Sequence, residues 1–233
     1  MDKLCKDQLA DKLVPLFKDA ENIDEAVKEA KNRLAVKAKQ LKEGYLEKLF
    51  DSQIQTEKDR GTPEAIIEML QNQRSDVLSK ASEMTFAEGH IPFLPVIPKT
   101  YVSIYYRMPM VKNGNKIGYT YLDPSELTDI EDVPTKPYYI YDVEDGTAML
   151  GKSPEKAEKL IRKDKRFPLT ADEVMSLGIH RDVLSDHYVD ATGSRCRSSR
   201  VPFLYLFGGR PRLGWDFAGD AYDGWGAGSC GSR

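Results

Sequence analysis

The longest regular pattern in the sequence is a helical stripe near the N-terminus. Hydrophobic residues recur there at steps of three or four, and lysines and glutamates fill most positions between them. This spacing follows the α-helical period and predicts a helix over residues 23–59. A second stripe predicts a helix over 63–82, begun by Thr62 and Pro63. Because the connection is short, we expect an antiparallel hairpin within a helical arm at 1–88. The positions of the first stripe are Ile23, Val27, Ala30, Leu34, Ala38, Leu41, Tyr45 and Leu49.

A proline-rich segment follows this arm. Pro92, Pro95 and Pro98 are evenly spaced within it. Each proline removes a backbone donor and favours extended geometry in the residue before it. We therefore expect residues 89–99 to form an extended strap that connects the arm to the rest of the chain.

Short strands and short helices are expected in the remaining residues, 100–233. Alternating hydrophobic positions predict strands near 101–111 and 116–122, and Asn113-Gly114 between them favours a hairpin turn. The whole pattern indicates an α+β fold: an N-terminal helical hairpin or small bundle, followed by a mainly antiparallel sheet domain with short flanking helices. The further elements expected are strands at 138–143, 201–207 and 213–217, and helices at 153–163 and 170–177, the last ended by Gly178.

The composition indicates an intracellular protein. No hydrophobic run reaches the roughly 18 residues that a membrane span needs, and the N-terminus lacks the apolar core of a secretory signal. The three cysteines are too few for a disulfide framework, so we expect reduced thiols and a cytoplasmic location. A net charge of -3 gives no overall attraction to nucleic acid. Because no phosphate-binding or dinucleotide-binding motif occurs, no cofactor is expected.

Four stretches of the C-terminal half resemble a prokaryotic domain family that is uncharacterised. The resemblance covers residues 137–231 and implies a self-contained domain. It implies no activity, because no catalytic residues are assigned in that family. In chain order the stretches are PYYIYDVEDGTAMLG, FPLTADEV, ATGSRCRSSRVPFLYLFGGRPRLGWDFAG and WGAGSCG.

The C-terminal segment is unusually rich in glycine and arginine. Nine of the seventeen glycines and six arginines lie within 193–233. Arginine binds phosphate or carboxylate through two parallel hydrogen bonds, and glycine allows backbone N–H groups to approach a ligand. We expect this face to bind an anionic small molecule, although ion pairs with nearby aspartates would also explain the arginines. The candidate ligand-binding residues are Arg195, Arg197, Arg200, Arg210, Arg212 and Trp215.

Other functions are open alternatives. A thiol-dependent or metal-assisted hydrolase would use Cys196 as its nucleophile, with His180 or His187 as the base. The two histidines are too far apart on a regular helix to share one ion, so no metal site is expected. A single-stranded nucleic-acid adaptor would use the tyrosines, eight of which fall within 101–141, but this segment has few basic residues. The pattern favours binding over catalysis, with the helical arm mediating self-association or contact with a protein partner.

Overall fold

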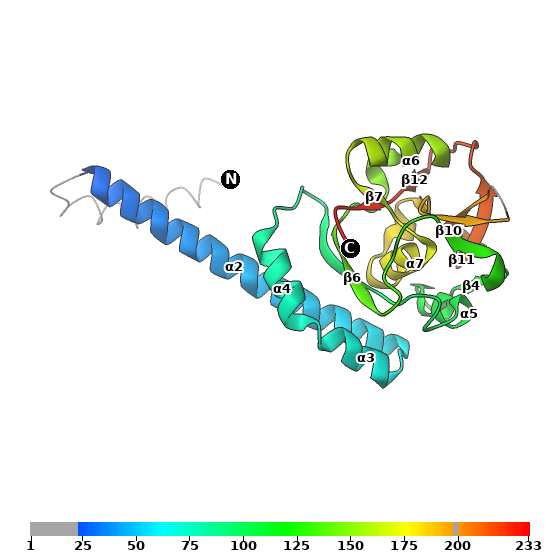
Figure 1. The fold of residues 1–233 in the computed structure, drawn as a ribbon, viewed down its shortest axis with the longest axis horizontal. Helices are drawn as coiled ribbons and strands as arrows, with labels where there is room; N and C mark the ends of the chain where they lie inside the picture. The colour runs from blue at the N-terminus through cyan, green and yellow to red at the C-terminus, as the bar shows by residue number, and fades with distance from the viewer. Residues whose placement is uncertain (1–22, 198–199) are drawn as a thin grey trace. The chain divides into compact units, whose positions relative to one another are not determined.

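The structure is a computed structural model that describes residues 23–197 and 200–233. The chain divides into two compact units, Met1–Lys48 and Leu49–Arg233. The helix α2 (Ile23–Arg60) belongs to both units and matches the long helix expected from the sequence (Figure 1). None of the helices in the described residues is both long and apolar enough to cross a membrane.

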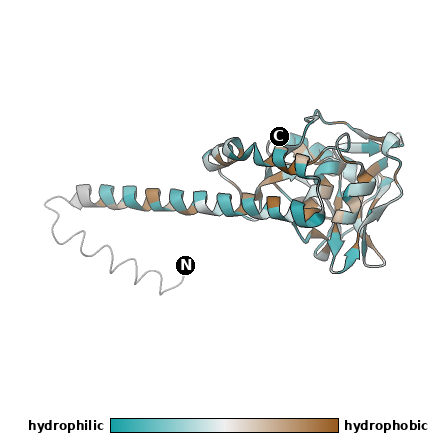
Figure 2. Ribbon diagram, turned by 90° about the horizontal axis from the view of Figure 1, so that it is seen from below, coloured by the Kyte–Doolittle hydropathy of each residue, from teal (hydrophilic) through white to brown (hydrophobic). Residues whose placement is uncertain are grey.

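In the first unit, α2 carries mainly hydrophilic residues with hydrophobic ones at regular intervals (Figure 2). Three large members of the predicted stripe are exposed: Leu34 at 48%, Leu41 at 67% and Tyr45 at 56%. The hydrophobic stripe of this part of the helix is therefore open to solvent at those positions.

The second unit begins with the expected helical hairpin, since Lys58 pairs with Glu64 across the turn and Asp51 pairs with Arg74 further along. The single helix expected over 63–82 is wrong, however. Two helices replace it, α3 (Glu64–Gln71) and α4 (Arg74–Glu83).

The helix is interrupted at Gln73, between α3 and α4. The Gln73 side chain donates to the carbonyl oxygen of Pro137 at 2.9 Å. Thr62 also differs from expectation. Its hydroxyl does not cap α3 but donates to Glu57 Oε2 at 2.5 Å. Contacts distant in sequence therefore override the local helix signals at both positions.

The expected strap at 89–99 is instead a strand of the protein interior. β1 (Ile91–Val96) is buried along its whole length and pairs antiparallel with β6 (Tyr138–Val143), the strand expected at 138–143. β6 is the only strand that pairs with β1 in the described residues. Because β1 is an edge strand, Pro92 and Pro95 are tolerated where their missing N–H groups are not needed for pairing.

The predicted hairpin of two long strands at 101–111 and 116–122 is wrong. Ser103 accepts a hydrogen bond from the Tyr105 backbone N–H and begins the helix α5 (Ile104–Arg107). A 3₁₀ helix (Met108–Met110) continues it. Only a short hairpin remains, made of β2 (Lys112–Asn113) and β3 (Lys116–Ile117), and β4 (Tyr119–Thr120) follows it.

Among the described residues, the largest sheet has seven strands, with a path ordered β12-β8-β10-β11-β4. Its centre is the antiparallel pair β10–β11, joined by Gly208 and Gly209, which both have positive φ. β9 pairs with β10 beside β8, and β5 pairs with β9; β7 and β13 form a separate pair. The bounds are β5 (Leu127–Asp129), β7 (Phe167–Pro168), β8 (Tyr188–Asp190), β9 (Ser194–Cys196), β10 (Arg200–Phe207), β11 (Arg210–Phe217), β12 (Trp225–Ala227) and β13 (Ser229–Cys230).

The core surrounds α7 (Ala171–His180), which contacts both β1 and β10 (Figure 1). Nine of its ten residues are buried. The expected capping box of Thr170 and Glu173 is present, but Gly178 lies inside the helix and does not end it. A Cβ atom at Gly178 would lie 2.6 Å from Leu204 Cδ2, so this glycine allows close approach of the sheet. The other flanking helix is α6 (Pro154–Lys163), as expected.

Candidate functional site

Two of the predicted ligand-binding arginines are already neutralised by carboxylates. Arg195 on β9 lies 2.5 Å from Glu158, and Arg197 lies 2.6 Å from Glu126. Internal ion pairing was the alternative explanation for the arginines in residues 193–233, and it applies to these two. Both guanidinium groups are thus engaged by carboxylates of the same chain.

The other three arginines lie on β10 and β11. Arg200, Arg210 and Arg212 have no carboxylate within ion-pair distance among the residues that the structure describes. The guanidinium carbon of Arg200 lies 3.6 Å from the ring centre of Trp215. That of Arg210 lies 4.5 Å from the ring centre of Tyr119. The predicted set thus divides into paired arginines and arginines that stack on aromatic rings.

Arg212 occupies the centre of the second group. It pairs with Tyr205 of β10 on one side and Tyr119 of β4 on the other. Its guanidinium carbon lies 5.4 Å from the ring centre of Tyr121 and 5.5 Å from that of Phe207. Its Nε atom is buried and has no hydrogen-bond partner. Such rings attract a guanidinium through its charge, but they accept no hydrogen bond from Nε.

A pocket of about 180 Å³ opens beside Arg212, where β4 ends and β11 continues. It contains Arg212 and Trp215, two of the six residues expected to bind a ligand. The lining residues are Tyr121, Leu122, Tyr205, Arg212, Leu213, Gly214 and Trp215.

Cys196, the candidate nucleophile, is buried on β9 and its thiol contacts the carbonyl oxygen of Arg200 at 3.7 Å. Burial raises the pKa of Cys196 to about 11, although the charges of Arg200 and Arg197 lower it. Burial also raises the pKa of Cys230 to about 12. Both thiols are therefore protonated at neutral pH, which is the opposite of what a thiolate nucleophile needs.

The two candidate bases lie in separate environments. His180, at the end of α7, contacts Glu57 Oε1 at 3.0 Å within a buried cluster that also contains Arg107. His187 contacts the carbonyl oxygen of Asp145 at 3.1 Å. Within 23–197 and 200–233, neither histidine bonds to a cysteine, and no three His, Cys, Asp or Glu side chains are placed to hold a metal ion.

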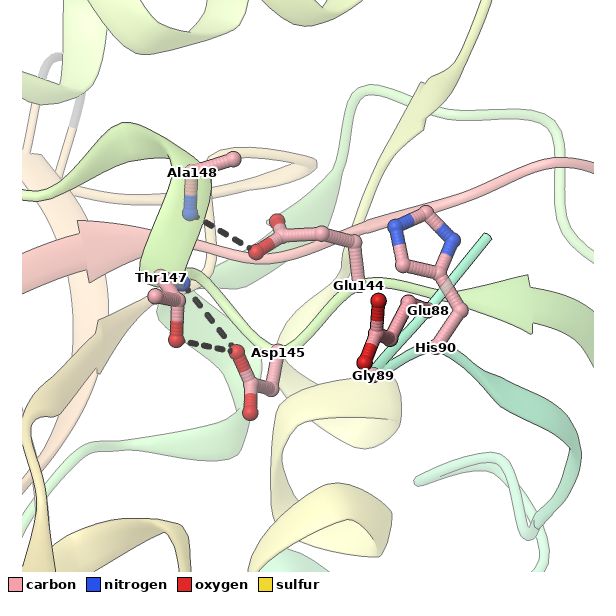
Figure 3. A pocket seen from close by; sticks show the side chains of 7 residues that line it. All are labelled: Glu88, Gly89, His90, Glu144, Asp145, Thr147 and Ala148. Carbon is pink, nitrogen blue, oxygen red and sulfur yellow. Dashed lines mark hydrogen bonds between the residues drawn. The ribbon is translucent and has the colours of Figure 1, made fainter. Parts of the chain in front are cut away.

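A second pocket, which the sequence analysis missed, lies at the end of the β1–β6 pair (Figure 3). Its volume is about 310 Å³. Ile91 pairs with Val143, so His90 and Glu144 come next to each other beyond the ends of the two strands. The pairing of β1 with β6 forms this site. It was not predicted, because residues 89–99 were expected to be a connecting strap. The lining residues are Glu88, Gly89, His90, Glu144, Asp145, Thr147 and Ala148.

The histidine of this pocket is held by a chain of polar groups. His90 Nδ1 lies 2.7 Å from Asp142 Oδ1, and Arg166 pairs with the other oxygen of Asp142. Burial alone would raise the pKa of Asp142, but its bonds to Arg166 and His90 hold that pKa below the ordinary value. Asp142 also has a φ of 52°, a left-handed conformation that non-glycine residues rarely adopt outside constrained sites.

Glu144 is the most buried carboxylate of this pocket, with 8% of its surface exposed. Its Oε1 atom accepts hydrogen bonds from the backbone N–H groups of Gly146 at 3.1 Å and Ala148 at 2.9 Å (Figure 3). Burial raises the pKa of Glu144 above its ordinary value, and the neighbouring charge of Asp145 raises it further. The Glu144 carboxyl is thus fixed in position but poorly solvated.

Comparison with known proteins identifies a family and no activity. No curated protein and no solved structure matches the chain. A family model described as "Family of unknown function (DUF5701)" matches residues 49–233, which confirms the resemblance to an uncharacterised domain family and extends it to the whole second unit. The chain therefore belongs to DUF5701, a family of unknown function.

Proposed function

We propose that this is a binding protein that holds a small anionic ligand in the pocket beside Arg212. The observation that carries the proposal is the state of this arginine: its buried Nε has no partner, and no carboxylate of the described residues neutralises it. A buried donor without a partner costs about 1–3 kcal/mol, and a charged one costs more. A carboxylate or phosphate bound to the guanidinium would offset that cost.

The size and walls of the pocket favour a small ligand. Its volume of about 180 Å³ is below the range of roughly 300–1,000 Å³ for drug-sized molecules, so it suits one acidic group and a short body. Tyr121, Tyr205 and Trp215 line it, so aromatic rings form part of its walls. A planar organic acid or phosphate fits these walls better than a bare ion.

The other functions considered have less support. A polyanion such as single-stranded nucleic acid could stack on the same rings, but a net charge of -3 gives it no overall attraction to the protein. A thiol hydrolase would need an ionised Cys196, which burial opposes.

Tryptophan fluorescence tests the anion site, because Trp215 lines it. We expect phenyl phosphate to change the emission saturably and inorganic phosphate to bind more weakly. Arg212→Met should weaken phenyl phosphate binding by about 10- to 100-fold, the effect of one or two charge-assisted hydrogen bonds. The matched control is Arg197→Gln, because Glu126 already pairs with that guanidinium.

Equal affinity of the Arg212→Met and wild-type proteins would contradict the proposal, as would an equal loss in the Arg197→Gln control. Thermal unfolding of each variant checks that it is folded. A nucleic-acid function would instead appear as oligonucleotide binding whose affinity falls steeply with salt.

We propose further that α2 mediates self-association through its exposed stripe. Leu34, Leu41 and Tyr45 are separated by seven and four residues, so they lie on one face of the helix, and each is about half exposed or more. A second copy of the chain would offer the same stripe and the same mixture of lysines and glutamates. We expect light scattering to show a dimer that Leu41→Glu converts to a monomer. Identical masses for the two proteins would contradict this.

A further inference from the structure

We propose that the pocket of Figure 3 is a second ligand site, one that binds the protonated amino group of a small organic amine. The site lies at the end of the β1–β6 pair and shares no lining residue with the pocket beside Arg212. The proposal rests on its own residues and is independent of the proposed anion site.

Several hydrogen-bond donors beside this pocket are already engaged within the chain. In the turn after β6, three backbone N–H groups near the pocket donate to side chains of the same turn. Those of Gly146 and Ala148 donate to Glu144 Oε1, and that of Thr147 donates to Asp145 Oδ1 at 3.1 Å. The Thr147 hydroxyl also donates to Asp145 Oδ1, at 2.7 Å. These three N–H groups are therefore not available to an anionic ligand.

The acceptors of the pocket show the opposite pattern. Glu144 Oε2, Asp145 Oδ2 and the carboxylate of Glu88 have no hydrogen-bond partner within the described residues. Glu144 as a residue is more than nine-tenths buried, but its Oε2 atom is not among the fully enclosed unpaired polar atoms, so this oxygen is open to the pocket. A ligand with several N–H donors and a positive charge would satisfy these oxygens together.

His90 is oriented to add another acceptor. The Asp142 carboxylate can only accept hydrogen bonds, because its pKa lies below the ordinary value. The proton of a neutral His90 ring must therefore lie on Nδ1, which contacts Asp142 at 2.7 Å. The lone pair of such a ring is on Nε2, which has no partner among the described residues.

An organic ammonium group fits these acceptors better than a metal ion does. The described part of the chain contains no three His, Cys, Asp or Glu side chains arranged as metal ligands. An ammonium group needs no such shell, because its three N–H donors reach acceptors spread around the pocket. The volume of about 310 Å³ leaves room for a short carbon chain beside Gly89 and Ala148.

Backbone amide NMR of the full chain tests this inference, with n-butylamine hydrochloride as the probe. At mildly alkaline pH and low salt, we expect butylammonium to shift the amide signals of Gly89, Thr147 and Ala148 saturably. The uncharged isostere 1-butanol and the anion butyrate should leave them unchanged. Absence of a saturable shift with butylammonium, or an equal response to butanol, would overturn the proposal.

Two glutamate variants give the matched comparison. Glu144→Gln should weaken butylammonium binding by about 10- to 100-fold, the effect of losing a charge-assisted hydrogen bond. Glu68→Gln removes the same charge from an exposed position on α3 and should change nothing. Equal weakening in both variants would show only a general effect of charge and would overturn the proposal.

If Glu144→Gln does not fold, Glu88→Gln serves in its place, because Glu88 is exposed and carries no internal hydrogen bond in the described structure. We expect a several-fold loss of butylammonium affinity in that variant, and unchanged affinity would refute the assignment. Affinity should also fall on acidification, as Glu144, whose pKa burial raises above its ordinary value, takes up a proton.

Discussion

Replacing Arg107 should destabilise the protein far more than replacing a surface arginine. Arg107 on α5 is 1% exposed and binds Glu57 through two hydrogen bonds, Nη1–Oε2 at 2.6 Å and Nη2–Oε1 at 3.1 Å. Glu57 itself is fully buried near the end of α2 and also contacts Thr62 and His180. The cluster thus ties three helices together across the core.

The expected loss in the free energy of unfolding follows from the state of Glu57 in the Arg107→Met variant. The Glu57 carboxylate would stay buried, having lost its only fixed positive charge and two of its four hydrogen bonds. Breaking a buried ion pair by removing one partner costs about 3–5 kcal/mol. For a domain of this size each kcal/mol lowers the melting temperature by about 2–4 °C, so we expect a decrease of about 6–20 °C.

The double variant Glu57→Leu, Arg107→Met removes both members of the ion pair. Comparing it with the single variants separates the free-energy cost of an unpaired Glu57 carboxylate from the cost of losing the ion pair itself. Replacement of a whole buried pair by apolar residues is often nearly neutral, so the double variant should be less destabilised than the two single variants added together. Thr62 and His180 lose an acceptor in the double variant, so recovery should be incomplete.

Urea unfolding followed by circular dichroism measures these free energies. A loss below about 1 kcal/mol for Arg107→Met, the range of exposed ion pairs, would contradict this expectation. Strict additivity of the two single variants would refute it as well, because the argument requires that the two side chains interact.

The pH dependence gives a second check on the same cluster. Burial alone would raise the pKa of Glu57, but the charge of Arg107 and the bond to His180 hold it far below its ordinary value of 4.5. A carboxyl with a depressed pKa stabilises the folded state above its unfolded pKa, and this stability is lost as the pH falls. We expect wild-type stability to drop below about pH 4.5, and the Glu57→Gln variant to show a shallower slope there.

Three further predictions follow from buried groups elsewhere in the fold. Burial raises the pKa of Cys196 to about 11, so a disulfide reagent at neutral pH should label it only as fast as the protein opens, and rapid labelling would contradict this. Burial raises the pKa of Asp190 from 3.8 to about 8, so the unfolded chain ionises first and stability should fall as pH rises across this interval. Urea unfolding of Asp190→Asn should show that slope removed. Gly226→Ala would place a Cβ against the carbonyl oxygen of Gly146 and should cost about 1–3 kcal/mol in thermal unfolding, whereas Gly224→Ala, with open space around it, should cost less.

Local signals in the sequence predicted the elements whose boundaries depend on nearby residues. The stripe at 23–59 and the capping box of Thr170 and Glu173 belong to this class, because the period and the capping bonds lie within one helix. The signals failed where distant contacts decide. Glycine is typical of helix ends, but Gly178 lies inside the helix, where Leu204 approaches it from the sheet.

Pairing between distant segments also decided which candidate residues form sites. All the arginines of the C-terminal segment look alike in sequence, yet Glu126 and Glu158, some 40 to 70 residues earlier, neutralise two of them. The amine pocket depends on the β1–β6 register, which brings His90 beside Glu144. Because the proline segment was expected to be a connection, no sequence pattern placed these two residues together.

One thermodynamic rule underlies both proposed sites, and it can be tested by crossing them. Buried polar groups normally find partners: Arg166 meets Asp142, Arg195 meets Glu158 and Arg233 meets Glu173. Arg212 Nε lacks an acceptor and Glu144 Oε2 lacks a donor among the described residues, so the two pockets are unmatched in opposite senses. If the mismatch at each pocket is what selects its ligand, Arg212→Met must weaken phenyl phosphate without affecting butylammonium, and Glu144→Gln must do the reverse. A variant that weakened both ligands equally would show that overall stability or net charge, and not local hydrogen-bond matching, governs binding to this domain.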